Sequence, residues 1–174
     1  MATIRRFSCH DLFLFNNVNL DYFTETYHMP FYMQYLAQWP EYCLQATGPG
    51  NQCMAYIFGK VEGRGELWHG HVTAVTVAPD YRRLSLAKKL MNLLEDVTTT
   101  QHRGYFVDLF VRVSNSSAIA MYKSFGYVVY RRVLGYYSGQ EDAFDMRKSM
   151  PRDAKKRSMV PLSRPVRPEE LEFD

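Results

Sequence analysis

The sequence contains no apolar run approaching the roughly 20 residues that a membrane-spanning helix needs. Residues 1–5 lead into alternating polar and apolar residues, unlike the start of a signal peptide. Cysteine is scarce: Cys9, Cys43 and Cys53 are odd in number, lack CxxC spacing and stand among apolar residues. Small buried hydrophobes are therefore favoured over disulfides or metal ligands. We expect a soluble protein of the reducing cytoplasm, without membrane association.

Charge of one sign is not in large excess either. The 21 Lys and Arg residues against 18 Asp and Glu give a net charge of +3. The basic residues gather in short groups, which suggests local anion sites and not a nucleic-acid-binding surface. The group at residues 155–157 has two open interpretations, a solvated tail or an electrostatic contact with ribosomal RNA or a partner subunit.

Length and composition predict one domain with a substantial core, because the 174 residues are 47% hydrophobic and contain no internal repeat. We assign residues 1–149 to that domain. Residues 150–174 carry four prolines, basic residues first and acidic residues last. This composition predicts a C-terminal tail, extended or docked on a partner.

Hydrophobic periodicity and turn residues predict an α/β protein with a mixed sheet. Two short helices are expected before any strand, over residues 9–17, with a capping box at Ser8 and Asp11, and from Pro30 to Trp39. Two longer helices are expected to begin near Leu86 and after Asn115. The expected strands cover residues 42–46, 54–60, 71–77, 105–113, 127–133 and 143–148.

The turn before the helix at Leu86 is the most informative stretch of the sequence. A tight turn entering a helix exposes unpaired backbone N–H groups at the positive end of the helix dipole, which favours bound phosphate. Arg82 and Arg83 add positive charge, and the small residues Ser85 and Ala87 let a pyrophosphate approach the backbone. An ordinary basic helix start has the same pattern, so the residues alone leave both interpretations open.

The order Arg82-x-x-Ser85-x-Ala87 resembles the (Gln/Arg)-x-x-Gly-x-(Gly/Ala) acetyl-CoA loop of the GNAT superfamily, with Ser85 in place of a glycine. The flanking order of strand, loop, helix, strand and Asn-started helix resembles it too. The resemblance implies a GNAT fold, a mixed twisted sheet of about seven strands with flanking helices, and acetyl-CoA as co-substrate without a metal. The implied cofactor-binding residues are Val75, Val77, Arg82, Arg83, Leu84, Ser85, Leu86, Ala87, Asn115 and Tyr122.

Further stretches resemble one branch of this superfamily, the NatB-type N-terminal acetyltransferases, and the resemblance covers nearly the whole chain. It implies acetylation of nascent polypeptide N-termini that begin Met-Asp, Met-Glu, Met-Asn or Met-Gln. It also implies a large helical-repeat auxiliary subunit and association with the ribosome. The matching stretches are residues 16–21, 24–27, 30–32, 68–74, 106–115, 136–137, 160–162 and 165–169.

Two other functions stay open. The chain can be a GNAT-fold lysine or small-amine acetyltransferase. It can also be a non-catalytic regulatory subunit that has lost cofactor binding. The observation behind this alternative is Ser85 in place of glycine.

The catalytic candidates are Tyr122, His71 and Tyr137. No Cys or Ser stands beside an obvious activating base, so direct attack by the amine on the thioester is favoured. Tyr122 matches the cofactor-facing tyrosine of the family and can donate to the departing thiolate, or it packs in the core. His71 can relay the ammonium proton, sense an acidic second residue, or be structural. His69 shares its strand face, but no third ligand is suitably spaced, so we expect no metal.

The substrate-binding candidates follow from the same resemblance. Glu25 and Tyr27 would contact the amine end of the peptide, and Tyr136 and Tyr137, in a hairpin loop, would close over it. Phe110 would border the pocket for the substrate methionine. A solvated loop, a capped sheet edge and core packing are the respective structural alternatives.

Specificity for an oxygen-bearing second residue requires hydrogen-bond donors. His71 and Thr73 point to one strand face, and either the imidazole N–H or the hydroxyl can supply a donor. Aromatic residues of the first two expected helices give more apolar surface than a small domain covers, which favours a partner. These residues are Phe13, Phe15, Phe31, Tyr32 and Tyr35.

Overall fold

The computed structural model describes residues 2–171. They form two compact units, the first from the chain up to Lys60 together with Val72–Val97, and the second from Val61–His71 together with the chain from Thr98 onward. The strands are hydrogen-bonded in the order β1-β2-β3-β4-β5-β7-β6, a mixed sheet of seven strands within the described residues. Their bounds are β1 Thr3–Arg6, β2 Leu44–Thr47, β3 Cys53–Glu62, β4 His69–Val77, β5 Phe106–Arg112, β6 Val128–Tyr137 and β7 Glu141–Ser149.

Three of the four expected helices are present as α-helices. They are α1 Met29–Gln38, α2 Leu86–Thr100 and α3 Ser116–Ser124. Proline in the first turn of α1 supplies a residue whose missing N–H needs no partner there. The Asn115 side chain accepts the N–H of Ala118 at 3.2 Å and so caps α3. No helix in the part of the chain that the structure describes is both long and apolar enough to cross a membrane.

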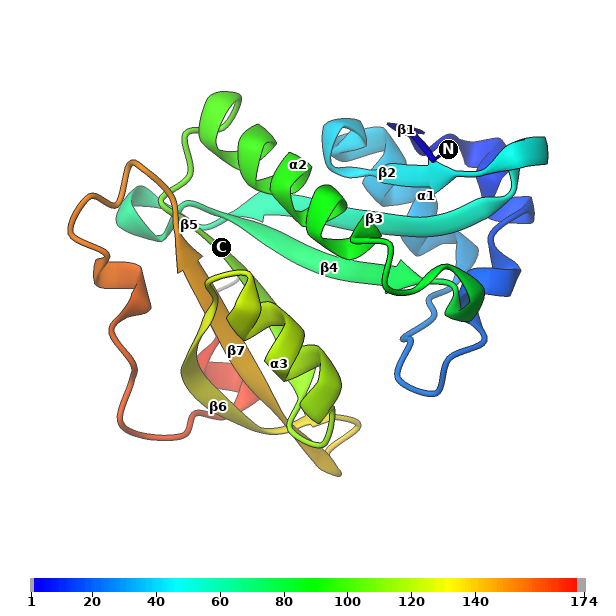
Figure 1. Cartoon of the computed structure of the whole chain (residues 1–174). Helices are drawn as coiled ribbons and strands as arrows, with labels where there is room; N and C mark the ends of the chain where they lie inside the picture. The colour runs from blue at the N-terminus through cyan, green and yellow to red at the C-terminus, as the bar shows by residue number, and fades with distance from the viewer. Residues whose placement is uncertain (1, 172–174) are drawn as a thin grey trace. The chain divides into compact units, whose positions relative to one another are not determined.

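In the first unit, β1 pairs antiparallel with β2 and β2 pairs antiparallel with β3 (Figure 1). Phe7, Phe15, Tyr32, Tyr56 and Phe58 form its buried aromatic core, in which most ring pairs meet edge to face. This geometry places the positive edge of one ring against the negative face of the next.

The expectation of one helix over residues 9–17, with no strand before it, is wrong. The segment forms two short 3-10 helices, η1 Cys9–Phe13 and η2 Asn16–Asn19, and β1 precedes them. The capping box at Ser8 and Asp11 is present, but the Asp11 carboxylate also receives two hydrogen bonds from Arg5 at 2.8 and 2.9 Å. The turn is thereby tied to β1, and Phe15, which lies between the two short helices, is buried in the core.

In the second unit, β7 lies between β5 and β6 and pairs antiparallel with both (Figure 1). Strand β6 is longer than expected and includes Tyr136 and Tyr137, which were expected in a hairpin loop. Gly135, with φ of +59°, lies where the register with β7 shifts, and the strand resumes at the pair Tyr137 and Glu141. A residue at positive φ of this kind allows the strand to bulge without breaking its pairing.

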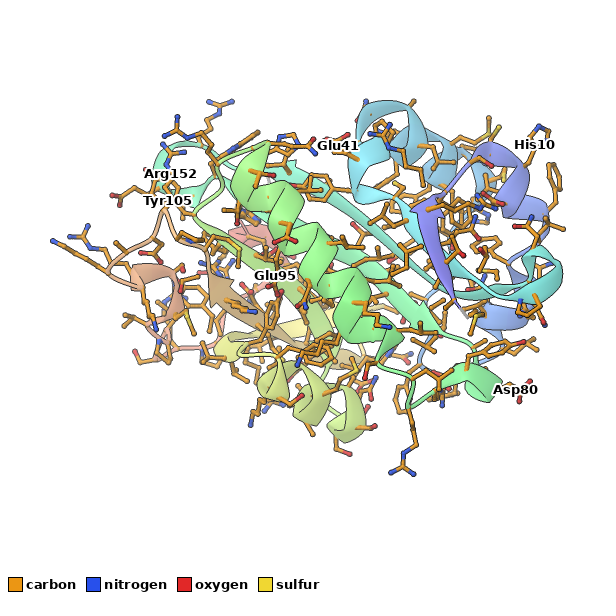
Figure 2. All side chains as sticks on the ribbon, turned by 45° about the horizontal axis from the view of Figure 1, so that its top comes forward. His10, Glu41, Asp80, Glu95, Tyr105 and Arg152 are labelled. Atoms are coloured by element: carbon orange, nitrogen blue, oxygen red, sulfur yellow. The ribbon has the colours of Figure 1, made fainter. Side chains whose placement is uncertain are left out.

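The residues after β7 pack along β6 of their own chain. Val166 forms a parallel bridge with Val133, and the N–H of Leu162 donates to the Tyr130 carbonyl at 2.7 Å. Val166 and Leu171 are buried with Val133 and Ala143 in one apolar cluster. Where this segment begins, the guanidinium of Arg152 stacks over the ring of Tyr105 at 4.3 Å (Figure 2).

Candidate functional site

The turn between β4 and α2 is built as the sequence predicts. Residues 82–85 are exposed, and the Ser85 carbonyl accepts the N–H of Lys89 at 3.0 Å, so Ser85 directly precedes the first helical residue. The following N–H groups have no acceptor within the helix and point out of its positive end. Arg83 and Ser85 have φ of +64° and +59°. This exposed backbone with orphan donors fits a pyrophosphate.

Around this turn, the Arg82 guanidinium lies 3.3 Å from the Asp21 carboxylate. Both side chains are partly exposed, so the pair is weakly stabilising and Arg82 remains able to meet an anion. Val75 and Val77 are half-buried at the end of β4. All of these residues belong to the first unit.

Two further cofactor candidates, Asn115 and Tyr122, belong to the second unit. Asn115 caps α3, as described above. Tyr122 is buried, with its ring 6.4 Å from Phe125 and 6.1 Å from Tyr127, both edge to face. Burial raises the pKa of the Tyr122 phenol, so this group keeps its proton and can donate a hydrogen bond. Both the catalytic and the core-packing interpretations fit this environment.

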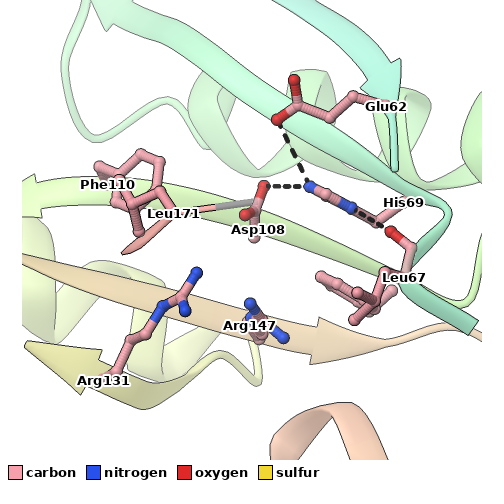
Figure 3. A pocket seen from close by; sticks show the side chains of 9 residues that line it. Glu62, Leu67, His69, Asp108, Phe110, Arg131, Arg147 and Leu171 are labelled. Carbon is pink, nitrogen blue, oxygen red and sulfur yellow. Dashed lines mark hydrogen bonds and ion pairs between the residues drawn. The ribbon is translucent and has the colours of Figure 1, made fainter. Parts of the chain in front are cut away.

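His71 lies in a buried cluster of charged groups in the second unit. Its Nδ1 is 2.7 Å from Oδ1 of Asp108, and the same oxygen is 3.3 Å from Nε2 of His69. Nε2 of His69 is also 3.6 Å from Glu62, and its Nδ1 is 2.5 Å from the Leu67 carbonyl oxygen. Figure 3 shows the contacts of His69 with Glu62, Asp108 and Leu67.

Two arginines complete this cluster. Arg131 and Arg147 both approach Asp145, at 2.9 and 3.3 Å. The Arg147 guanidinium lies 4.5 Å from the centroid of the Phe106 ring. The His69 ring stacks parallel to the same Phe106 ring, with the ring centroids 4.5 Å apart. Figure 3 shows Arg131 and Arg147 lining the same pocket as His69 and Asp108.

Burial and charge act in opposite directions on these groups. Burial alone would lower the pKa of His69, but the charge and hydrogen bonds of Asp108, with Glu62 and Leu67, raise it to about 10. Burial opposes ionisation of Asp108, yet His69 and His71 hold the pKa of that carboxyl well below its usual range. Burial, followed by the charge of Asp108, raises the pKa of Asp145. The cluster thus joins a charged His69 to a charged Asp108.

The aromatic substrate candidates of the second unit are in contact with one another. Phe110 stacks on Tyr136 with ring centroids 4.7 Å apart, and Tyr136 meets Tyr137 edge to face at 5.1 Å. His71 lies 5.5 Å from Phe110. His71 is therefore linked through Phe110 to Tyr136, and through Tyr136 to Tyr137. Sequence reasoning missed Arg112 as a support, whose guanidinium lies over the Tyr137 ring at 4.1 Å.

The other substrate candidates, Glu25, Tyr27 and Thr73, belong to the first unit. Glu25 is exposed in the segment between η2 and α1, and Tyr27 stacks on Phe31 at 4.2 Å. The Thr73 hydroxyl donates to the Tyr35 hydroxyl at 2.8 Å. Tyr35 was expected only as part of an aromatic surface, and no local signal indicated this bond.

Residues 12–127 match the acetyltransferase (GNAT) family, two thirds of the chain. The chain belongs to this family. A relative from Arabidopsis thaliana, the N-terminal acetyltransferase B complex catalytic subunit NAA20, is 64% identical over 100% of both chains. The N-alpha-acetyltransferase 20 of Dictyostelium discoideum is 58% identical over 99% of this chain and 100% of its own. The crystal structure of Chaetomium thermophilum Naa20 in complex with a bisubstrate analogue is 41% identical, covers 96% of this chain and 97% of that chain, and has a TM-score of 0.90.

The expected GNAT membership and the mixed sheet of about seven strands are thus confirmed. The GNAT loop pattern has glycine at the position of Ser85, and the structure gives a reason. A φ of +59° lies in the left-handed region that glycine adopts at no steric cost. Ser85 adopts this conformation although it carries a Cβ.

The expectation that His69 and His71 lack a third carboxylate or histidine nearby is wrong. Glu62, from β3, offers a ligand atom, and those of the three residues lie within 4.8 Å of one another. Glu62 stands next to glycines in the sequence, which favours a turn there. Its proximity to the histidines follows from the pairing of β3 with β4, which residue spacing in the sequence does not reveal. Asp108 contacts both imidazoles, so His69 and His71 are part of a network of ion pairs and hydrogen bonds.

Proposed function

We propose that this chain is the catalytic subunit of a NatB-like complex, and that it transfers acetyl from acetyl-CoA to the α-amino group of N-termini beginning Met-Asp, Met-Glu, Met-Asn or Met-Gln. The observation that carries the proposal is full-length similarity, 64% identity over the whole of both chains, to a relative named as such a catalytic subunit. The NatB acetyltransferase complex bound to a bisubstrate inhibitor includes a chain similar to this one, with a TM-score of 0.87 and 39% identity.

Acetyl-CoA supplies the activated thioester, and the turn from Arg82 to Ala87 holds its pyrophosphate. The N–H groups at the start of α2 donate to the phosphate oxygens, and Arg82 and Arg83 supply charge. Asn115 contacts the pantetheine arm while it caps α3, and the half-buried Val75 and Val77 offer strand backbone beside it. The exposed, left-handed turn supports this assignment.

The chemistry needs a neutral amine. His71 accepts the ammonium proton at Nε2, and the amine lone pair then attacks the thioester carbonyl carbon. The new N–C bond forms, the C–S bond breaks with its electron pair on sulfur, and the second amine proton neutralises the thiolate. Tyr122, whose phenol keeps its proton, donates a hydrogen bond to the departing sulfur.

Recognition of the peptide uses the remaining candidate residues. Glu25 and Tyr27 contact the amine end, Tyr136 and Tyr137 hydrogen-bond its backbone, and Phe110 borders the methionine side chain. The contact chain from His71 through Phe110 to Tyr136 supports this grouping, because it places the proposed base beside the proposed aromatic wall. Tyr137 belongs to the catalytic group through its place at the end of this wall.

An auxiliary subunit covers an apolar surface of the first unit. Among the aromatic residues expected there, Phe15, Tyr32 and Tyr35 are buried in the core, so that part of the expectation is wrong. Phe13, Leu20 and Tyr22 are nevertheless 75%, 79% and 91% exposed. We assign these exposed side chains to the surface that the auxiliary subunit covers. We place the complex in the cytoplasm, where it meets nascent chains at the ribosome.

The decisive experiment is an acetylation assay with peptides varied at their first two residues, using the full chain with its auxiliary subunit. We expect Met-Asp, Met-Glu, Met-Asn and Met-Gln peptides to be acetylated at the α-amino group and an internal lysine to be spared. Acetylation of lysine alone would favour the small-amine or lysine acetyltransferase, and failure to bind acetyl-CoA in calorimetry would indicate a non-catalytic subunit.

A further inference from the structure

The hydrogen bond between His71 and Asp108 determines which nitrogen of the imidazole can accept a proton. A carboxylate accepts and does not donate, so the 2.7 Å contact requires the proton of His71 on Nδ1. The other nitrogen, Nε2, then carries the lone pair. Asp108 lies on β5 with its carboxylate buried, so solvent does not compete for this bond.

We propose that Asp108 is the positioning residue for His71, fixing the tautomer that presents the Nε2 lone pair to the substrate amine. The inference rests on the proposed function, in which His71 takes the ammonium proton. Once that proton is on Nε2, both ring nitrogens of His71 carry hydrogen, and the adjacent carboxylate stabilises the resulting cation.

His69 keeps Asp108 charged. Its Nδ1 faces the Leu67 carbonyl oxygen and its Nε2 faces oxygens of Asp108 and Glu62, which are all acceptors. With a carbonyl oxygen at Nδ1 and two carboxylates at 3.3 and 3.6 Å from Nε2, the ring is stabilised as a cation with a proton on both nitrogens. The buried imidazolium therefore holds Asp108 in its ionised form, through which it acts on His71.

The charges facing this cluster balance without His71. Glu62 on β3, Asp108 on β5 and Asp145 on β7 are three carboxylates. His69 on β4, Arg131 on β6 and Arg147 on β7 are three cations that contact them. A His71 whose single proton is on Nδ1 adds no charge to these pairs, and its Nε2 lone pair is what a base requires.

The first test observes the wild-type protein. Long-range ¹H–¹⁵N correlation spectra at pH 8, assigned with His71→Gln, report which ring nitrogen carries the proton. We expect hydrogen on Nδ1 of His71 and on both nitrogens of His69. Hydrogen on Nε2 of His71 would overturn the proposal, whether or not any variant folds.

The second test compares variants of the full chain with its auxiliary subunit. Asp108→Asn keeps an acceptor oxygen but removes the charge, and Asp108→Leu removes both. We expect kcat for a Met-Asp peptide to fall about tenfold or more in Asp108→Asn and further in Asp108→Leu, with KM little changed. Asp153→Asn removes a structural carboxylate of the same unit, bound to Ser158 and the Arg157 N–H, and serves as the matched control.

The pH profile separates positioning from a merely structural effect. Loss of the neighbouring carboxylate disfavours the protonated imidazole, so the acid limb of kcat/KM should move to lower pH in Asp108→Asn. An unmoved limb, or losses equal to those of Asp153→Asn, would overturn the inference while leaving the proposed function intact. Activity lost with a chelator and restored by Zn²⁺ would also overturn it. A wild-type complex that acetylates no Met-Asp peptide would instead refute the proposed function, and the tautomer measurement would still stand.

Discussion

The Ser85 carbonyl accepts the N–H of Lys89 in the first hydrogen bond of α2, while the φ of Ser85 is +59°. A residue with a Cβ at that angle is strained by roughly 1 kcal/mol relative to glycine. The helix start therefore imposes a glycine-like conformation on a serine, in the turn proposed to bind the pyrophosphate.

Ser85→Gly should leave the fold intact and change the free energy of unfolding by between zero and about +1 kcal/mol, since relief of strain is offset by added chain entropy. Affinity for acetyl-CoA, measured by calorimetry, should stay the same or tighten. Ser138→Gly relieves the same strain, at φ of +54°, outside this turn and should not change that affinity. A clear loss in Ser85→Gly alone would show that the hydroxyl is itself a ligand.

The hydrogen bond between Thr73 and Tyr35 should be measurable as a coupling energy. Thr73→Val and Tyr35→Phe each remove one hydroxyl of a part-buried pair, and each should destabilise the protein by about 1 kcal/mol. The double variant should cost less than the sum, with a coupling of about 0.5–1.5 kcal/mol in chemical denaturation. Additive losses would mean that the bond contributes nothing to folding and that the Thr73 hydroxyl is free for the substrate.

The elements that sequence predicted well are those with local signals. Asn115 caps α3, and α2 begins at Leu86 as its periodicity indicates. Strand β1 was missed because four residues, two of them arginine, carry no alternation strong enough to detect. Elements were therefore predicted where a capping residue or a hydrophobic period lies within the element itself.

The site was predictable residue by residue but not as a network. Phe110 was expected beside the substrate methionine, yet the contact of Asp108 with His71 and His69 depends on how β5 lies beside β4, which the local sequence does not reveal. Glu62 was hidden for the same reason. Ion pairs between side chains of different strands produce no regular residue spacing within one segment of the sequence, so sequence patterns do not predict them.

His69 should make stability depend on pH. Its pKa is raised to about 10 in the folded protein, against about 6.5 in an unfolded chain. The folded state then binds one more proton between these values, so the stabilisation is complete below pH 6.5 and is lost as pH rises through 10. The free energy of unfolding of the wild type should fall by about 1.4 kcal/mol per pH unit in that window, relative to His69→Gln. His10→Gln, at an exposed histidine, should keep the wild-type slope. Parallel curves for wild type and His69→Gln in urea denaturation would show that His69 is not a buried cation.

The packing of the C-terminal segment should matter for both stability and peptide binding. Leu171 is 9% exposed and is buried with Val133 and Val166, against which Phe110 and Tyr136 pack. Leu171→Ala removes buried methyl groups and should destabilise the protein by about 2–3 kcal/mol, near the low end of such changes because the site lies at the edge of the cluster. The loosened support should raise KM for a Met-Asp peptide more than it lowers kcat, since the affected rings are proposed to bind substrate and not to move protons. Leu162→Ala is the matched control, because Leu162 lies in the same segment but is 39% exposed. If both variants behave alike in thermal unfolding and in KM, the segment acts only as a surface cover, and the aromatic wall holds its shape without Leu171.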